Sequence, residues 1–260
     1  MTEDKVIDLR SDTLTHPTEQ MRRAMQAAEV GDDCHSEDPT VNRLEAIAAE
    51  RLSMESALYL PSGTMANSTA LITHLQLTTS KPNDETPGLV VHEVHAHMFS
   101  ADRDRIAKAL FPIKSASILT EWGVITPTQL QATLSFHPNS HPQLLCLENT
   151  HNYTGGGALT PRQMSNVATT AHSAGMHVHC DGARLCNAAI AQQLPVSDLV
   201  RDIDSVMFCV SKGLSAPVGS ILCGNSEFIE AARNTRKIHG GSMRQAGVIA
   251  AAGIVAIEEM

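Results

Sequence analysis

Several features are missing from this sequence, and each absence excludes a class of protein. No block of like charge stands out and the formal net charge is −9, which disfavours nucleic acid and anionic membranes as partners. No run is apolar for long enough to span a bilayer, and the acidic N-terminus (Met1–Lys5) resembles neither a signal peptide nor a typical transit peptide. The six cysteines fall in no paired spacing, which is typical of a reducing compartment without disulfides. We therefore expect a soluble, cytoplasmic protein whose partner is a small molecule.

The apolar residues make up 42% of the chain, which is enough for a sizeable core. Short apolar runs alternate with helix-length amphipathic segments, and no internal repeat interrupts this order. Such alternation is typical of the α/β class, with a mostly parallel sheet covered by helices on both faces. The expected strands are Ala57–Leu60, Gly88–His92, Gln143–Leu147, Met176–Cys180, Ser205–Val210 and Val218–Cys223; the expected helices are Met65–Gln76, Pro161–Ser173 and Ser226–Arg236; the expected surface loops are Thr78–Gly88 and Phe136–Pro142.

Three parts are expected along the chain. Residues 1–30 form an N-terminal arm, residues 31–245 a large domain, and residues 246–260 the beginning of a further helix. The helix predicted over Ala246–Met260 has no C-terminal stop signal. We therefore expect that a small C-terminal domain would follow this helix and is missing.

Two charged residues follow apolar strands in the second half of the chain. Lys212 comes after the run ending at Val210, and Asp181 after the run ending at Cys180. A lysine amine can form a Schiff base with the aldehyde of pyridoxal phosphate (PLP), and an aspartate can keep the pyridine nitrogen protonated. Alone, Lys212 would be a solvated loop residue and Asp181 a helix N-cap. Together, at the carboxyl ends of strands, they indicate a PLP site.

A Ser-Gly-Thr segment between an expected strand and an expected helix completes the pattern. Ser62, Gly63 and Thr64 offer two hydroxyls, a glycine that permits close approach and the N–H groups of a helix start, all suited to a phosphate. The tripeptide is common, and a simple helix cap is the alternative. Arg184, three residues after Asp181, could bind a substrate carboxylate or a cofactor oxygen, or form a surface ion pair.

With these residues in view, the chain resembles the low-specificity L-threonine aldolases, fold type I PLP-dependent enzymes of the aromatic amino acid β-eliminating lyase group. The similarity runs from Ile7 to Met260. It rests on seven blocks in order: Asp8–Thr13, Gly31–Asp33 with Glu37–Thr40, Pro61–Met65, Leu147–Asn152, Asp181–Leu185, Ser211–Leu214, and Gly240–Gly247. The resemblance implies a fold type I large domain that cleaves L-threonine or L-allo-threonine to glycine and acetaldehyde as a homodimer or homotetramer.

The resemblance also implies a role for each matching cofactor residue. Lys212 would carry the cofactor, Asp181 would pair with the pyridine nitrogen, and Arg184 would lie near a cofactor oxygen or the substrate carboxylate. His97 would stack on the cofactor ring. The phosphate would be bound by Ser62, Gly63 and Thr64.

Substrate and subunit contacts follow from the same resemblance. Ser11 would help Arg184 to hold the substrate carboxylate. Lys237 and Arg244 would reach the site of a neighbouring subunit. A histidine near the substrate hydroxyl is expected just before the Leu147–Asn152 block; we choose His141, with His137 as the alternative.

The sequence departs from the family pattern at three places. His35-Ser36 stands where Tyr-Gly is common, and Asp102–Arg105 replaces a Glu-Ala-Gly-Gly run after His97. The small domain, with an arginine that clamps the substrate carboxylate, would lie beyond residue 260. Two alternatives therefore remain open: a catalytically impaired, truncated aldolase-like subunit, and a PLP-dependent β-eliminating lyase.

The histidines offer a rival from another class of enzyme. His92, His95 and His97 are close together, and His177 and His179 share one strand face with Asp181. A His-x-His strand is found in metal-dependent hydrolases. Buried strand histidines that merely form hydrogen bonds are the commoner interpretation.

Overall fold

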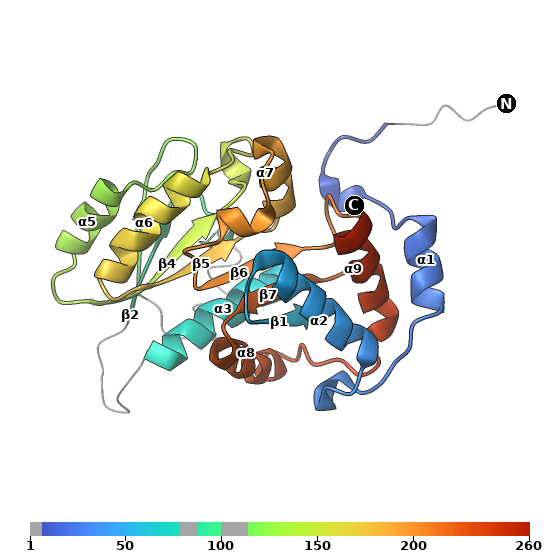
Figure 1. Ribbon diagram of the computed structural model, residues 1–260. Coiled ribbons are helices and arrows are strands. Elements are labelled where there is room, and N and C mark those ends of the chain that lie inside the picture. The colour runs from blue at the N-terminus through green and yellow to red at the C-terminus, as the bar shows by residue number, and fades with distance from the viewer. Residues whose placement is uncertain (1–6, 79–87, 100–113) are drawn as a thin grey trace.

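The computed structural model describes residues 7–78, 88–99 and 114–260, and in these residues seven strands form one sheet (Figure 1). The strands are β1 (Ser56–Leu60), β2 (Gly88–Glu93), β3 (Lys114–Ile118), β4 (His141–Glu148), β5 (His177–Asp181), β6 (Ser205–Cys209) and β7 (Ser220–Gly224). Their order across the sheet is β1-β7-β6-β5-β4-β2-β3. β7 runs antiparallel to both of its neighbours, and the other neighbouring strands are parallel. The prediction of a mostly parallel α/β sheet is confirmed.

Helices cover both faces of this sheet. They are α1 (Glu19–Gln26), α2 (Pro39–Leu52), α3 (Gly63–Thr78), α5 (Pro127–Ser135), α6 (Pro161–Ser173), α7 (Leu185–Gln192), α8 (Ser226–Ile238) and α9 (Gly247–Glu259), with short 3-10 helices η1 (Asp12–Leu14), η2 (Asp33–His35), η3 (His97–Phe99), η4 (Asn152–Thr154) and η5 (Val196–Leu199). Figure 1 shows α3 and α8 on one face, and α2, α5, α6 and α7 on the other. α1 and α2 both pack against α9, so part of the predicted N-terminal arm lies on this helix. The three-part division of the chain remains a prediction.

Local sequence signals explain where several elements begin. α6 starts at Pro161 with a reciprocal cap, in which Thr160 Oγ1 accepts from the Gln163 N–H and Gln163 Oε1 accepts from the Thr160 N–H. β6 and β7 are buried at every position, which explains their continuous apolar runs. Such strands hold the residues at their ends in fixed positions.

The predicted strands and helices all occur, with boundaries shifted by up to two residues. The loop predicted over Phe136–Pro142 is wrong at its end, because His141 and Pro142 already pair with β2 as the first residues of β4. Residues 79–87 of the loop predicted over Thr78–Gly88 lie outside the described residues. β3 was not predicted, because this edge strand has only two buried residues and a polar sequence.

None of the helices in the described ranges combines the length and the apolarity needed to cross a bilayer. All six cysteines are free thiols, and four of them are buried.

Candidate active site

Two adjoining cavities open beyond the carboxyl ends of β5 and β6. The Asp181 cavity has a volume of about 240 Å³ and the Arg184 cavity about 600 Å³. His97 and Lys212 line both, so the two cavities form one site. Other lining residues include Ser62, Gly63, Thr64, Asn67 and Asp181 in the first cavity, and Ser11, Asp12, Asn152 and Arg184 in the second.

Lys212 lies three residues after the end of β6, in a turn whose backbone is held by two hydrogen bonds. Its backbone carbonyl accepts a hydrogen bond from the Ser215 N–H at 2.8 Å, and Ser215 has a left-handed backbone with φ of 63°. The same carbonyl accepts from Thr15 Oγ1 at 2.8 Å, which links the N-terminal arm to the site. The turn therefore fixes the backbone from which the Lys212 amine reaches the cavities.

Asp181 is the last residue of β5 and is only 1% exposed. Its Oδ2 accepts a hydrogen bond from Asn67 Nδ2 at 2.7 Å, and its Oδ1 accepts from the Ala183 N–H at 3.1 Å. Burial alone would raise the pKa of this carboxyl, but His97, whose Nδ1 lies 3.8 Å from Oδ2, and the charge of Lys212 together hold it below its usual value. The result is a buried, ionised carboxylate facing a cavity, which suits a cationic ring N–H.

The segment 62–64 forms the start of α3. Ser62 Oγ accepts from the Met65 N–H at 3.2 Å, so this serine does act as a helix cap. The N–H groups of Gly63 and Thr64 lie in the first helical turn, where a helix has no internal acceptors for them. A Cβ on Gly63 would lie 3.0 Å from Cys209 Sγ and from the Met207 methyl carbon, so glycine is needed for this close approach to β6. The cap and an anion-binding role are compatible here.

Arg184 forms a two-pronged ion pair with Asp12 of the N-terminal arm. Arg184 Nε and Nη2 donate to Asp12 Oδ2 and Oδ1 at 2.7 and 2.8 Å, and Nη1 donates to Asn152 Oδ1 at 3.1 Å. The hydrogen bond to Asp12 raises the pKa of Arg184 and lowers that of Asp12. The pair places a fixed guanidinium in the wall of the Arg184 cavity.

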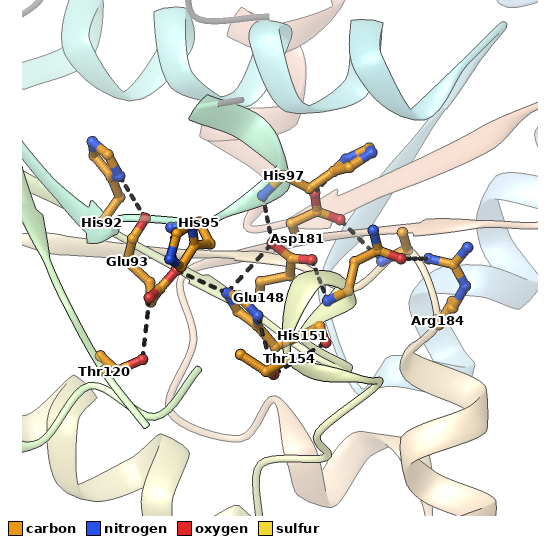
Figure 2. Close-up of polar contacts among 12 residues, drawn as sticks. His92, Glu93, His95, His97, Thr120, Glu148, His151, Thr154, Asp181 and Arg184 are labelled. Atoms are coloured by element: carbon orange, nitrogen blue, oxygen red, sulfur yellow. Dashed lines mark hydrogen bonds and ion pairs between the residues drawn. The ribbon is translucent and has the colours of Figure 1, made fainter. Parts of the chain in front are cut away.

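A buried acidic cluster lies beside Asp181, as Figure 2 shows. Glu148 pairs with Asp181 in register across β4 and β5, and its carboxylate accepts from the backbone N–H groups of His97 at 2.6 Å and Asn152 at 2.8 Å. Burial, together with the negative charge of Asp181, raises the pKa of Glu148 to about 7. Glu148 thus ties the backbone of the η3 and η4 segments to the end of β4.

The same cluster continues with Glu93 and His151. His151 Nε2 lies 3.1 Å from Glu93 Oε2, and both side chains are almost fully buried. Burial lowers the pKa of His151. Neither Glu148 nor His151 was predicted as a site residue, although both lie in the Leu147–Asn152 block that carries the family resemblance, and that block was the signal in the sequence that could have indicated them.

Comparison with known proteins gives the family. The beta-eliminating lyase family model matches residues 8–260. The chain belongs to the beta-eliminating lyase family. Among its relatives is low-specificity L-threonine aldolase 1 of Arabidopsis thaliana, 40% identical over 261 residues that cover 97% of this chain and 70% of that protein. The low specificity L-threonine aldolase of Escherichia coli K12 is 38% identical over 260 residues, covering 97% of this chain and 73% of the bacterial protein.

Solved structures support the same fold. The threonine aldolase of Leishmania major superposes with a TM-score of 0.80 at 17% identity, covering 96% of this chain and 71% of that one. A chain from Listeria monocytogenes superposes with a TM-score of 0.78 at 21% identity, covering 92% of this chain and 64% of that one. At these identities the likeness concerns the fold alone. The chain spans about two thirds to three quarters of the lengths of these relatives.

The structure brings most of the predicted site residues of this family member together. The residues that line the two cavities are Lys212, Asp181, His97, Ser62, Gly63, Thr64, Ser11 and Arg184. Lys237 and Arg244 do not line them: both side chains are exposed, and Arg244 pairs with Asp32 at 3.1 Å. Their reach to a neighbouring subunit stays a prediction.

His141 is a correction. It is the first residue of β4, whereas Glu148 at the other end of the same strand pairs with Asp181. Eight residues of extended strand separate the two ends by more than about 20 Å, so His141 cannot approach a ligand in the site of its own chain. His137, the alternative, precedes β4 at the same end of the strand as His141 and lines neither cavity. The choice failed because the loop was expected to continue to residue 142.

Two of the three departures from the family pattern lie within residues 1–260. His35 ends η2 as an exposed residue outside both cavities, and the Asp102–Arg105 segment lies outside the described residues. The rival metal site gains no support, because within the described ranges no three His, Cys, Asp or Glu side chains converge as ligands. His179 uses both ring nitrogens on Ser205 and Asn67 instead.

Proposed function

We propose that this chain binds PLP at the joined cavities and cleaves L-threonine or L-allo-threonine to glycine and acetaldehyde. The observation that carries the proposal is the buried, ionised Asp181 in one cavity wall with Lys212 in the same wall. When bound, the cofactor supplies an aldehyde for amine condensation and a ring that takes up the electron pair released when the Cα–Cβ bond breaks. All other tasks fall to side chains of the protein.

Each cavity residue has a task in this proposal. The Lys212 amine holds the cofactor aldehyde, and the Asp181 carboxylate keeps the proton on the ring nitrogen. Ser62, Gly63 and Thr64 bind the phosphate through their hydroxyls and the N–H groups of the first turn of α3. His97 lies against Asp181 and lines both cavities, so we assign to it the contact with the ring and acceptance of the β-hydroxyl proton.

Substrate orientation falls to Arg184 and Ser11. The Arg184 guanidinium is fixed by Asp12 and Asn152 and lines the larger cavity, where Ser11 also lies. A guanidinium binds a carboxylate through charge-assisted hydrogen bonds. Holding the carboxylate there would leave the Cα–Cβ bond free to turn perpendicular to the ring plane.

The association predicted from the sequence stays part of the proposal. The side chains of Lys237 and Arg244 are exposed. Lys237 lies in the last turn of α8 and Arg244 follows this helix, so both remain available to a second copy of the chain. A two-fold dimer, or a dimer of dimers, is the usual closed symmetry. We also keep the cytoplasmic location, since every cysteine is a free thiol.

The test is product analysis with the chain reconstituted with PLP. We expect glycine and acetaldehyde from L-threonine, and no glycine from the Lys212→Ala variant. Lys114→Ala is the matched control, because Lys114 is an exposed lysine of β3 that donates a hydrogen bond to Ser140 and lines neither cavity. Pyruvate and ammonia from an amino acid with a β-leaving group, without glycine from threonine, would instead favour β-elimination, the alternative suggested by the family description.

A further inference from the structure

A row of buried polar side chains begins at Asp181 and Asn67 in the wall of the Asp181 cavity and continues between β5, β6 and α3. Asn67 Nδ2 donates to Asp181 Oδ2 at 2.7 Å, and Asn67 Oδ1 lies 3.1 Å from His179 Nε2. On the other side of its ring, His179 Nδ1 lies 2.8 Å from Ser205 Oγ, which lies 2.7 Å from His74 Nε2. We call Asn67, His179, Ser205 and His74 the Asp181 chain. It includes His179, one of the two strand histidines for which the sequence left a metal site and a purely hydrogen-bonding role open.

The hydrogen bonds of the Asp181 chain can run in only one direction when Asp181 is ionised. A carboxylate only accepts, so Asn67 must turn its amide N–H to Asp181 and its oxygen to His179. His179 must then carry its proton on Nε2. A neutral His179 accepts at Nδ1 from the Ser205 hydroxyl, which leaves the Ser205 oxygen to accept from His74 Nε2–H.

Burial keeps the two histidines of this chain neutral. His179 is fully buried, and His74 is 4% exposed. Burial lowers the pKa of His179 to about 4, although the negative charge of Asp181 opposes this effect, and burial lowers the pKa of His74 as well. The His74 ring ends the chain by stacking on Phe228, with ring centroids 4.4 Å apart. Both histidines are therefore held in the neutral form.

We propose that Asn67, His179, Ser205 and His74 are positioning residues that fix the orientation of Asp181 and supply its inner hydrogen bond. The inference rests on the proposed function in one respect, namely that Asp181 serves the ring nitrogen of the cofactor. None of the four lies on the family blocks that carry the resemblance. The Asp181 chain acts through the direction of its hydrogen bonds. Without the N–H donor of His179, the Asn67 amide is free to turn its oxygen toward the Asp181 carboxylate, which then loses its hydrogen-bond donor.

The first experiment needs no cofactor. Imidazole ¹⁵N NMR of the full chain without PLP should show His179 neutral, protonated on Nε2, and unchanged between about pH 5.5 and 8.5, since its pKa is about 4. The groups that face it are Asp181, Asn67, Ser205 and His74, all of them buried. A His179 protonated on Nδ1, or one that titrates in this range, would overturn the direction of the chain.

The second experiment compares variants after PLP reconstitution. Asn67→Leu and His179→Leu remove a donor from the chain, while His179→Gln keeps an amide N–H that can reach Asn67. The matched control is Thr73→Val, which removes a buried hydrogen bond to Thr235 from the same helix outside the chain. A hydrogen bond to a buried charge corresponds to about a ten- to hundredfold effect. We expect kcat for threonine to fall by that factor in both leucine variants with KM within about threefold, and to be largely restored in His179→Gln.

The outcomes separate the two proposals. If Asn67→Leu retains the kcat of Thr73→Val in a wild-type protein that does cleave threonine, the Asp181 chain has no positioning role and the proposed function stands. If the wild-type chain fails to take up PLP, the proposed function fails, while the NMR experiment still decides whether His179 and Asn67 form the directed chain. Leucine variants that fold poorly are judged on the wild-type NMR result and on His179→Gln.

Discussion

The ion pair between Asp12 and Arg184 should control both the N-terminal arm and substrate binding. Replacement of Asp12 by asparagine removes the charge and leaves one acceptor for two donors that now lie at 2.7 and 2.8 Å. The two side chains are 26% and 22% exposed, so solvent screens the pair only in part. A charge-assisted hydrogen bond in such a place contributes about 1–2 kcal/mol.

That free energy predicts about a 5- to 30-fold change in two measurements. Hydrogen exchange of the backbone amides of Leu14 in η1 and of Thr15, which caps it, should accelerate by this factor in Asp12→Asn, because the arm is released from the site. KM for threonine should rise by a similar factor, because Arg184 loses the partner that fixes its orientation. Asp8→Asn is the matched control for the exchange measurement, since Asp8 pairs with Arg10 on the same arm and not with Arg184.

Two results would refute this reasoning. If η1 exchanges at the same rate in Asp12→Asn and Asp8→Asn, the ion pair does not hold the arm. If KM falls in Asp12→Asn, then Asp12 competes with the substrate for the guanidinium rather than positioning it.

Three further predictions concern stability. Arg236→Leu should lower the free energy of unfolding in urea by about 3–5 kcal/mol, because the Asp33 carboxylate, 2.9 Å away and 1% exposed, would be left buried without its partner. Replacing Asp33 and Arg236 together by leucine should restore most of this loss of stability. Gly219→Ala should lower Tm, since φ is +111° and a Cβ would lie 2.4 Å from the Tyr59 ring, and an unchanged Tm would contradict that geometry. The pKa of Asp204 falls to about 2, because hydrogen bonds from two histidines and a backbone N–H outweigh the effect of its burial. The ionised Asp204 therefore stabilises the folded protein by on the order of 1 kcal/mol after solvent screening, and this contribution is present above pH 3.8 and lost toward pH 2. Asp204→Asn should remove this acid dependence in thermal melts.

The parts of the structure that the sequence predicts are those with strong local signals. β6 and β7 are buried at every position and read as apolar runs, and Pro161 marks the first turn of α6. Lys212 and Asp181 could be found because Asp181 ends β5 and Lys212 lies three residues beyond the end of β6, both at the carboxyl edge of the sheet.

Other features depend on residues that are distant in the sequence. Asp12 and Arg184 are 172 positions apart, and no local pattern joins them. His179 could be placed on one strand face with Asp181, but its partner Asn67 comes from α3 and is separated from it by 112 positions. His141 was misplaced because the start of β4 depends on pairing with β2, which the residues around position 141 do not encode.

The central claim is that Lys212 and Asp181 hold the cofactor, and one measurement tests it most directly. The chain is incubated with PLP, reduced with borohydride, digested, and mapped by mass spectrometry. The account predicts one stoichiometric cofactor adduct, on Lys212, that is retained in Lys114→Ala and absent from Lys212→Ala. An adduct spread over several exposed lysines, or one that persists at the site in Lys212→Ala, would contradict it.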